Sequence, residues 1–191
     1  VYRGSNLIKK LLALSKKGHG KKERISPVKQ LDDLCRFFNR LLGSRIKVEK
    51  YLKIESGEKT EILMNATEFD QVFMNLAINS RDAMPDGGII TITEEIVSLG
   101  KKDKIVPPSP HAGKYFKVSF RDTGTGIPEK IREKVFEPFF STKKQKQGTG
   151  LGLAIVFAIV SNSGGAVTLN STDGRGTIFE IYLPLLSDIG E

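Results

Sequence analysis

Residues 122–155 read DTGTGIPEKIREKVFEPFFSTKKQKQGTGLGLAI, and this stretch decides the fold of the chain. Its glycine clusters, DTGTG at 122–126 and GTGLG at 148–152, enclose a segment rich in lysine, serine and threonine. Glycine permits turns that a side chain forbids and lets backbone N–H groups approach a ligand closely. The second cluster leads into an apolar helical pattern, and the first N–H groups of a helix have no partner within it. The stretch therefore predicts a phosphate-binding turn at a helix N-terminus, with an acidic residue, Asp122, at the head of the first cluster.

The composition is that of a soluble globular domain with a short appendage: the chain has 191 residues, of which 39% are apolar and 27% charged. The single cysteine, Cys35, excludes an internal disulfide, and no cluster of Cys and His suggests zinc. The longest apolar run, residues 151–160, is shorter than the roughly 20 residues that span a membrane. We expect no signal peptide and no membrane contact by this chain.

The basic character of the chain is confined to its N-terminus. The net charge is +8, and residues 1–24 hold eight Lys or Arg and one acid, so +7 of the charge lies there. The remaining 167 residues carry 22 basic and 21 acidic groups. The main domain therefore has no general positive charge, and we expect no nucleic-acid partner.

Apolar periodicity predicts the order of the elements. Residues 6–17 have the spacing of a helix end, and a flexible basic linker is expected over 18–25. Ser26 and Pro27 form a helix start signal, so a helix is predicted over 28–42. Alternation predicts strands at 45–53, 61–65, 89–97, 115–121, 166–171 and 177–183, and shorter apolar patterns predict helices at 128–134 and 150–163.

The helix predicted over 67–84 carries two distinct faces. Thr67 is its expected N-cap, with Asp70 in the place of a capping-box acid. Asn75, Asn79 and Asp82 share one face, and three oxygen-bearing side chains in a row favour a cation or polar ligand. The face expected to pack on the core consists of Phe69, Val72, Phe73, Leu76, Ser80 and Ala83.

Asp122 continues the inner face of a predicted strand. Phe116, Val118 and Phe120 point to the core, and by the same period Asp122 points with them. A carboxylate is costly to bury without a partner, so Asp122 is a candidate specificity residue. The alternative is an aspartate that only caps a turn.

Four segments in this order resemble the conserved boxes of the histidine kinase catalytic domain. NLAINSRDAM (75–84) is similar to the N box, DTGTGI (122–127) to the first glycine box, FEPFFSTK (136–143) to the F box and GTGLGLAIV (148–156) to the second glycine box. GRGTIFEIYLP (174–184) resembles the closing hairpin of the same domain. The chain is thereby identified as a member of the GHKL superfamily, which has the Bergerat fold. RDAMPDGG (81–88) is most similar to nitrogen-regulator-type and hybrid sensor kinases.

The resemblance implies an α/β two-layer sandwich, in which a mostly antiparallel mixed sheet of about five strands carries three helices on one face. It implies that residues 1–17 end the second helix of a dimerisation hairpin, 18–25 form a linker and 26–186 form the catalytic ATP-binding domain. The implied activity is transfer of the ATP γ-phosphate to a histidine on that hairpin, in a cytoplasmic and dimeric parent protein that also meets a response-regulator receiver domain. Whether the parent is membrane-anchored stays open.

The resemblance also implies residue roles. Asp122 accepts a hydrogen bond from the adenine amine, with Thr177 helping through water, and Asn79 ligates Mg²⁺. Gly148, Gly150 and Gly152 let backbone amides meet the phosphates, and Lys143 lies near the γ-phosphate as a counter-charge. The other box residues expected to contact ATP are Asn75, Asp82, Gly124, Gly126, Ile127, Phe136, Phe139, Thr142, Thr149 and Leu151.

Two departures qualify the resemblance. In the ATPase branches of the superfamily a glutamate four residues before the magnesium asparagine activates water, and Asn75 stands there in this chain. An amide is no general base, so transfer to another acceptor is favoured over hydrolysis, with Asn75 and Lys143 as the catalytic candidates. Neither His19 nor His111 is followed by the acidic residue of a phospho-acceptor box, so the acceptor is expected outside this chain. The alternatives are a gyrase- or chaperone-like ATPase clamp, a non-catalytic nucleotide-sensing or scaffold module, and a serine kinase of the same fold.

Overall fold

The computed structural model describes residues 21–100, 112–142 and 149–186. The elements follow the chain as β1 (Glu23–Ile25), α2 (Pro27–Leu41), β2 (Ile46–Lys53), β3 (Ile62–Met64), α3 (Ala66–Ala83), β4 (Gly88–Leu99), β5 (Gly113–Asp122), the 3₁₀ turn Glu129–Ile131, α4 (Gly152–Asn162), β6 (Ala166–Ser171) and β7 (Thr177–Pro184). The predicted helix end over 6–17 lies outside the described residues.

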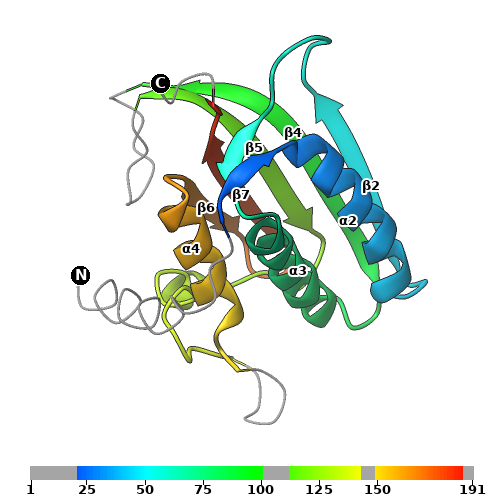
Figure 1. Ribbon diagram of the computed structural model, residues 1–191. Coiled ribbons are helices and arrows are strands. Elements are labelled where there is room, and N and C mark those ends of the chain that lie inside the picture. Colours follow the sequence, from blue (N-terminus) through cyan, green and yellow to red (C-terminus); the bar gives the residue numbers. More distant parts are fainter. Residues whose placement is uncertain (1–20, 101–111, 143–148, 187–191) are drawn as a thin grey trace.

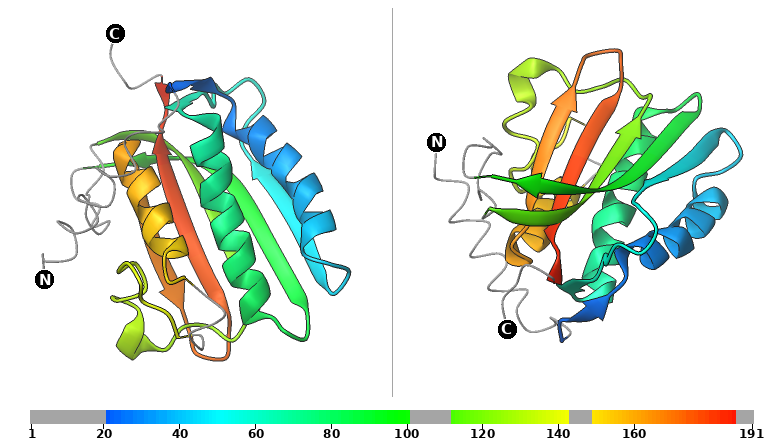
Figure 2. Two further views of the ribbon diagram at one scale, coloured as in Figure 1. Left: turned by 60° about the horizontal axis from the view of Figure 1, so that its bottom comes forward. Right: turned by 90° about the horizontal axis from the view of Figure 1, so that it is seen from above.

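Two layers make up the domain. Five strands form one sheet in the order β2-β4-β5-β7-β6, in which β2 and β4 are parallel and the other neighbours antiparallel. Helices α2, α3 and α4 lie side by side on one face of this sheet (Figures 1 and 2). The predicted α/β sandwich, with five strands and three helices, is therefore confirmed among the described residues.

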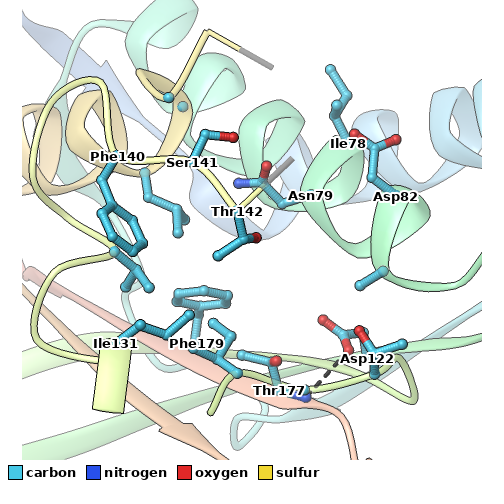
Figure 3. A pocket seen from close by; sticks show the side chains of 18 of the residues that line it. Ile78, Asn79, Asp82, Asp122, Ile131, Phe140, Ser141, Thr142, Thr177 and Phe179 are labelled. Atoms are coloured by element: carbon cyan, nitrogen blue, oxygen red, sulfur yellow. Dashed lines mark hydrogen bonds between the residues drawn. The ribbon is translucent and has the colours of Figure 1, made fainter. Parts of the chain in front are cut away.

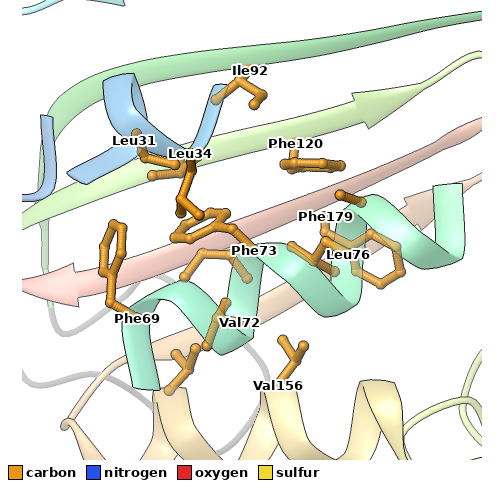
Figure 4. Close-up of a cluster of buried hydrophobic side chains, with 14 of the residues drawn as sticks. Leu31, Leu34, Phe69, Val72, Phe73, Leu76, Ile92, Phe120, Val156 and Phe179 are labelled. Atoms are coloured by element: carbon orange, nitrogen blue, oxygen red, sulfur yellow. The ribbon is translucent and has the colours of Figure 1, made fainter. Parts of the chain in front are cut away.

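The core between the layers is built on phenylalanines of α3 and the central strands (Figure 4). The rings of Phe69 and Phe73 lie 4.8 Å apart, and Phe73 lies 6.4 Å from Phe120 of β5. Phe69, Phe73 and Phe120 are fully buried, as the predicted core face of α3 requires. Burying a side chain of this size stabilises the fold by about 1.5–3 kcal/mol, so this cluster holds α3 against the sheet.

The helix starts agree with the sequence in one case and differ in another. Ser26 caps α2, its Oγ accepting the Lys29 N–H at 3.5 Å, and Pro27 is the first helical residue. The N-cap of α3 is Asn65 and not Thr67, because the Asn65 side chain accepts the Glu68 N–H at 3.1 Å. The prediction of Thr67 was wrong by two residues.

Asp70 also has a different role from the predicted one. Its carboxylate accepts a 2.8 Å hydrogen bond from the Gln30 side chain and so links α3 to α2. The helix predicted over 128–134 is reduced to the single 3₁₀ turn Glu129–Ile131.

Part of the expected linker is ordered structure. Glu23–Ile25 forms β1 and pairs antiparallel with β3, an association that no local pattern signals. Just before it, the Lys22 ammonium donates a 2.8 Å hydrogen bond to the backbone carbonyl of Asn162, at the C-terminus of α4. This hydrogen bond joins the N-terminal part of the described chain to the C-terminus of α4. No helix among the described ranges is long and apolar enough to cross a membrane.

Candidate functional site

A cavity of about 980 Å³ opens between α3, α4 and the ends of β5 and β7 (Figure 3). Its walls come from segments far apart in the sequence, as the sandwich brings the helix ends and the glycine turns to the same edge. Eleven of the predicted site residues line it: Asn75, Asn79, Asp82, Asp122, Gly126, Ile127, Thr142, Thr149, Gly150, Gly152 and Thr177.

Asp122 lines the cavity, and the residue as a whole is 3% exposed. Its Oδ1 accepts the backbone N–H of Thr177 at 3.2 Å (Figure 3). Oδ1 also accepts the backbone N–H of Gly124 at 2.9 Å, and Oδ2 accepts the Ser80 hydroxyl at 2.8 Å. A carboxylate offers about four lone-pair positions, so the described residues leave about one position on Oδ2 for a ligand that donates a hydrogen bond. Among these donors, Ser80 was predicted only as a core residue and not as a part of the site.

Gly124 does not line the cavity, but it explains the geometry of Asp122. A Cβ at Gly124 would lie 2.8 Å from Cβ and 2.9 Å from the carbonyl oxygen of Ala83. Only glycine lets this turn approach α3 closely enough for its N–H to reach Asp122. Position 126 also requires glycine, because its φ is +74° and a Cβ there would lie 2.1 Å from the Thr172 carbonyl oxygen.

At the opposite end of the cavity, two amides of α3 face the start of α4. A Cβ on Gly152 would lie 3.6 Å from the Asn79 side-chain amide and 3.8 Å from that of Asn75, so the glycine leaves this space open. The Nδ2 atom of Asn75 is buried and has no hydrogen-bond partner among the described residues. Among the described residues no side chain caps the start of α4, and Gly152 and Leu153 of its first turn line the cavity. Free N–H groups at a helix start attract anions such as phosphate.

The F box and the second glycine box meet through their backbones. The Phe139 N–H donates a 2.9 Å hydrogen bond to the Gly150 carbonyl, and both residues have positive φ, 66° and 65°. The Phe139 side chain is 65% exposed and lies outside the cavity wall. Phe136 also lies outside the wall, and its partly buried ring packs behind it, with its centroid 5.7 Å from that of Phe157 and 6.4 Å from that of Phe179.

Of the remaining predicted residues, Leu151 lies beside the cavity but not in its wall. Lys143 and Gly148 fall outside the described residues, so their expected roles stay predictions. The lining residues that the sequence did not predict are mainly apolar. They come from loops and from separate elements, so no single periodic pattern marks them as a group. The apolar ones are Ile78, Pro128, Ile131, Val135, Phe140, Leu153 and Phe179. Ala83, Thr125, Ser141 and Asp173 complete the wall.

The donor set limits the kind of metal site that the cavity could hold. In the described part of the chain, no three His, Cys, Asp or Glu side chains gather to hold a metal ion. A cation here would therefore take few ligands from the protein. The amide oxygens of Asn75 and Asn79 are hard ligands that suit Mg²⁺, which keeps several waters and binds phosphates.

The chain belongs to the family of histidine kinase-, DNA gyrase B- and HSP90-like ATPases, whose model matches residues 64–187. Its fold is that of the ATP-binding catalytic domain of a sensor histidine kinase.

Curated relatives agree with this class. The chain is 38% identical over 185 residues to the sensor kinase CckA of Brucella abortus (strain 2308), covering 96% of this chain and 19% of the relative. It is 33% identical to sporulation kinase C of Bacillus subtilis (strain 168), covering 95% of this chain and 37% of that protein. The chain thus spans only a minor part of the length of these relatives.

Solved structures support the fold. The mycobacterial sensor histidine kinase MprB superposes with a TM-score of 0.66 at 25% identity, over 86% of this chain and 97% of that one. The catalytic domain of the histidine kinase ThkA superposes with a TM-score of 0.65 at 25% identity, over 87% and 99% of the two chains.

Proposed function

We propose that this domain binds Mg-ATP in the cavity and transfers its γ-phosphate to a histidine on the dimerisation hairpin of the parent protein. A response-regulator receiver domain would then take the phosphoryl group from that histidine. The observation that carries the choice of transfer over hydrolysis is Asn75, an amide beside Gly152 at the end of the cavity opposite Asp122. A carboxylate at this position could activate water, whereas an amide cannot.

The lining of the cavity suits an adenine nucleotide. The acceptor position that the described residues leave on Asp122 fits the exocyclic amine of adenine, and the apolar wall fits the faces of the base. The start of α4, which no described side chain caps, fits the phosphates. Asn79, with Asn75 beside it, would hold Mg²⁺, which supplies charge neutralisation on the phosphates when bound.

Transfer of a phosphoryl group needs positioning and charge neutralisation more than covalent chemistry from the protein. In this proposal α3 orients the amides, the glycine turn before α4 orients the backbone donors, and Lys143 adds a positive charge. The nucleophile is the imidazole of the hairpin, which the domain itself does not contribute.

The test is phosphorylation in trans. The domain is incubated with ATP labelled on the γ-phosphate and with the separately produced hairpin of its parent protein. The proposal predicts label on the hairpin in a form that is labile in acid and stable in base, and no label on the domain alone. Acid-stable phosphoserine on a partner would indicate the serine kinase instead, and rapid phosphate release without transfer would indicate an ATPase clamp.

A further inference from the structure

The charged side chains in the described wall of the cavity are carboxylates. Asp82, Asp122 and Asp173 belong to this wall, and no Lys or Arg does among the described residues. Lys143, the expected counter-charge, lies outside those residues. The proposed ligand carries a chain of negative phosphates, and a carboxylate repels them where nothing offsets its charge. The described charges of the wall therefore oppose an anionic ligand.

Among these carboxylates, Asp82 follows the proposed metal residue on the same helix. It comes three residues after Asn79 in α3, and both side chains belong to the cavity wall (Figure 3). Residues three apart on a helix lie on one face, with Cβ atoms about 5–6 Å apart. The charge of Asp82 therefore acts at short range on phosphates that Asn79 and its cation would hold.

Asp82 is paired with the arginine that precedes it. The Nε and Nη2 atoms of Arg81 lie 3.1 Å and 3.0 Å from Oδ1 of Asp82, so both donate to one oxygen. Successive residues of a helix do not face each other, so the guanidinium has to bend round the helix toward Asp82. The side chains of Arg81 and Asp82 are 44% and 25% exposed, and a pair this exposed contributes little to stability.

We propose that Arg81 is a positioning residue for nucleotide binding, which neutralises Asp82 so that the triphosphate can approach this face of α3. Arg81 acts through Asp82 and does not itself line the cavity. Without Arg81 the carboxylate would weaken the binding of the phosphates, and without Asp82 the guanidinium would strengthen it. This inference rests on the proposed function, because it places the phosphates of ATP beside α3.

The alternative is a purely structural role for Arg81. It is the basic residue in the last turn of α3, where a positive charge interacts favourably with the helix dipole. That role would change the stability of the fold but would not distinguish nucleotides by their charge. Arg36 and Asp33 on α2 provide a matched control, because they form an exposed ion pair at 3.3 Å and neither residue lines the cavity.

The experiment measures the Kd for ATP and for AMP in the presence of a chelator, so that no metal ion offsets the charge of Asp82. Arg81→Gln should raise the Kd for ATP about threefold to tenfold, and Asp82→Asn should lower it by a similar factor. The double variant should stay within about twofold of the original chain, because both charges are removed together. The Kd for AMP, which has fewer phosphate charges, should change much less. Arg36→Gln should leave both Kd values unchanged.

A higher or unchanged Kd for ATP in Asp82→Asn would overturn the proposal, because Asp82 would then not repel the phosphates. An equal loss of affinity for ATP and AMP in Arg81→Gln would also overturn it, because the effect would then be structural. Asp82→Asn decides the question by itself should circular dichroism show Arg81→Gln unfolded. Failure of the unaltered chain to bind ATP would instead defeat the proposed function and this inference with it.

Discussion

The hydroxyl of Ser80 on α3 donates a 2.8 Å hydrogen bond to Oδ2 of Asp122 at the end of β5. This bond joins the helical layer to the sheet beside the cavity. With the two backbone donors on Oδ1, it holds the carboxylate from both layers, so that the orientation of Asp122 is set before a ligand arrives.

The first prediction concerns Asp122 itself. In Asp122→Asn an NH₂ group, itself a donor, would face the donors that now bind the carboxylate, or else the amine of adenine. The affinity for ATP should therefore fall by about tenfold to a hundredfold. Titration with a fluorescent ATP analogue measures this, and circular dichroism checks the fold. Asp173→Asn is the matched control, because Asp173 lines the same cavity on an exposed turn. Equal losses in the two variants would remove the special role of Asp122.

The second prediction concerns the cation. Asn79→Ala should weaken ATP binding in Mg²⁺ by about tenfold, or 1.4 kcal/mol, and much less in the presence of a chelator, where no ion needs the side chain. Calorimetric titrations in the two conditions give both values. The same loss in both would mean that Asn79 supports the structure and holds no ion.

The third prediction compares two glycines of similar conformation. Gly150 has φ +65°, and a Cβ there would lie 2.5 Å from the Phe139 carbonyl carbon, whereas Gly174 has φ +73° and open space around it. Gly174→Ala should cost about 1 kcal/mol of stability from its backbone conformation alone. Gly150→Ala should cost about 1–3 kcal/mol more and weaken ATP binding, since the turn before α4 must shift. Urea unfolding and ATP titration of both variants measure this, and indistinguishable variants would contradict the close packing of Gly150 on Phe139.

The fourth prediction is a pH dependence of stability that is unrelated to the nucleotide. Burial raises the pKa of Glu94 from 4.5 to about 7, although Lys50, 2.9 Å away, opposes the shift and Asp32 adds to it. A raised pKa in the folded state means that the neutral carboxyl stabilises the fold. This contribution is complete below about pH 4.5 and is lost as the pH rises through about 7.

Glu94→Gln should therefore be less sensitive than the original chain to a pH increase from about 5 to about 8, as measured by urea unfolding. Glu95→Gln is the control, because Glu95 is ion-paired with Lys117 and only partly buried. A control that loses the pH dependence to the same degree would mean that Glu94 is not its source.

Periodicity predicted most of the fold because most elements follow local patterns. Ser26 and Pro27 marked the start of α2, and the phenylalanine stripe marked the buried face of α3. The strand Glu23–Ile25 was missed because its pairing with Ile62–Met64 is non-local. The N-cap prediction of Thr67 missed Asn65 because both residue types are good caps, and only the path of the chain decides between them.

In the site, the sequence predicted the residues that belong to the glycine boxes or to one face of α3, such as Asp122 and Asn79. It did not predict the hydrogen bonds of Ser80 and Ser171. Ser80 contacts a residue 42 positions away, and the Ser171 hydroxyl meets Ile127 at a separation of 44. In the sequence alone, these serines cannot be told from ordinary core or strand residues, because their partners become neighbours only when the helices pack on the sheet.

The most direct test of the account is a titration of this chain with Mg-ATP in which inorganic phosphate is measured in the same samples. The account predicts saturable binding at one site with almost no phosphate released over the time of the titration, because Asn75 provides no base for water. Absence of binding would contradict the nucleotide site, and rapid release of phosphate would contradict a domain that holds ATP for transfer to a histidine.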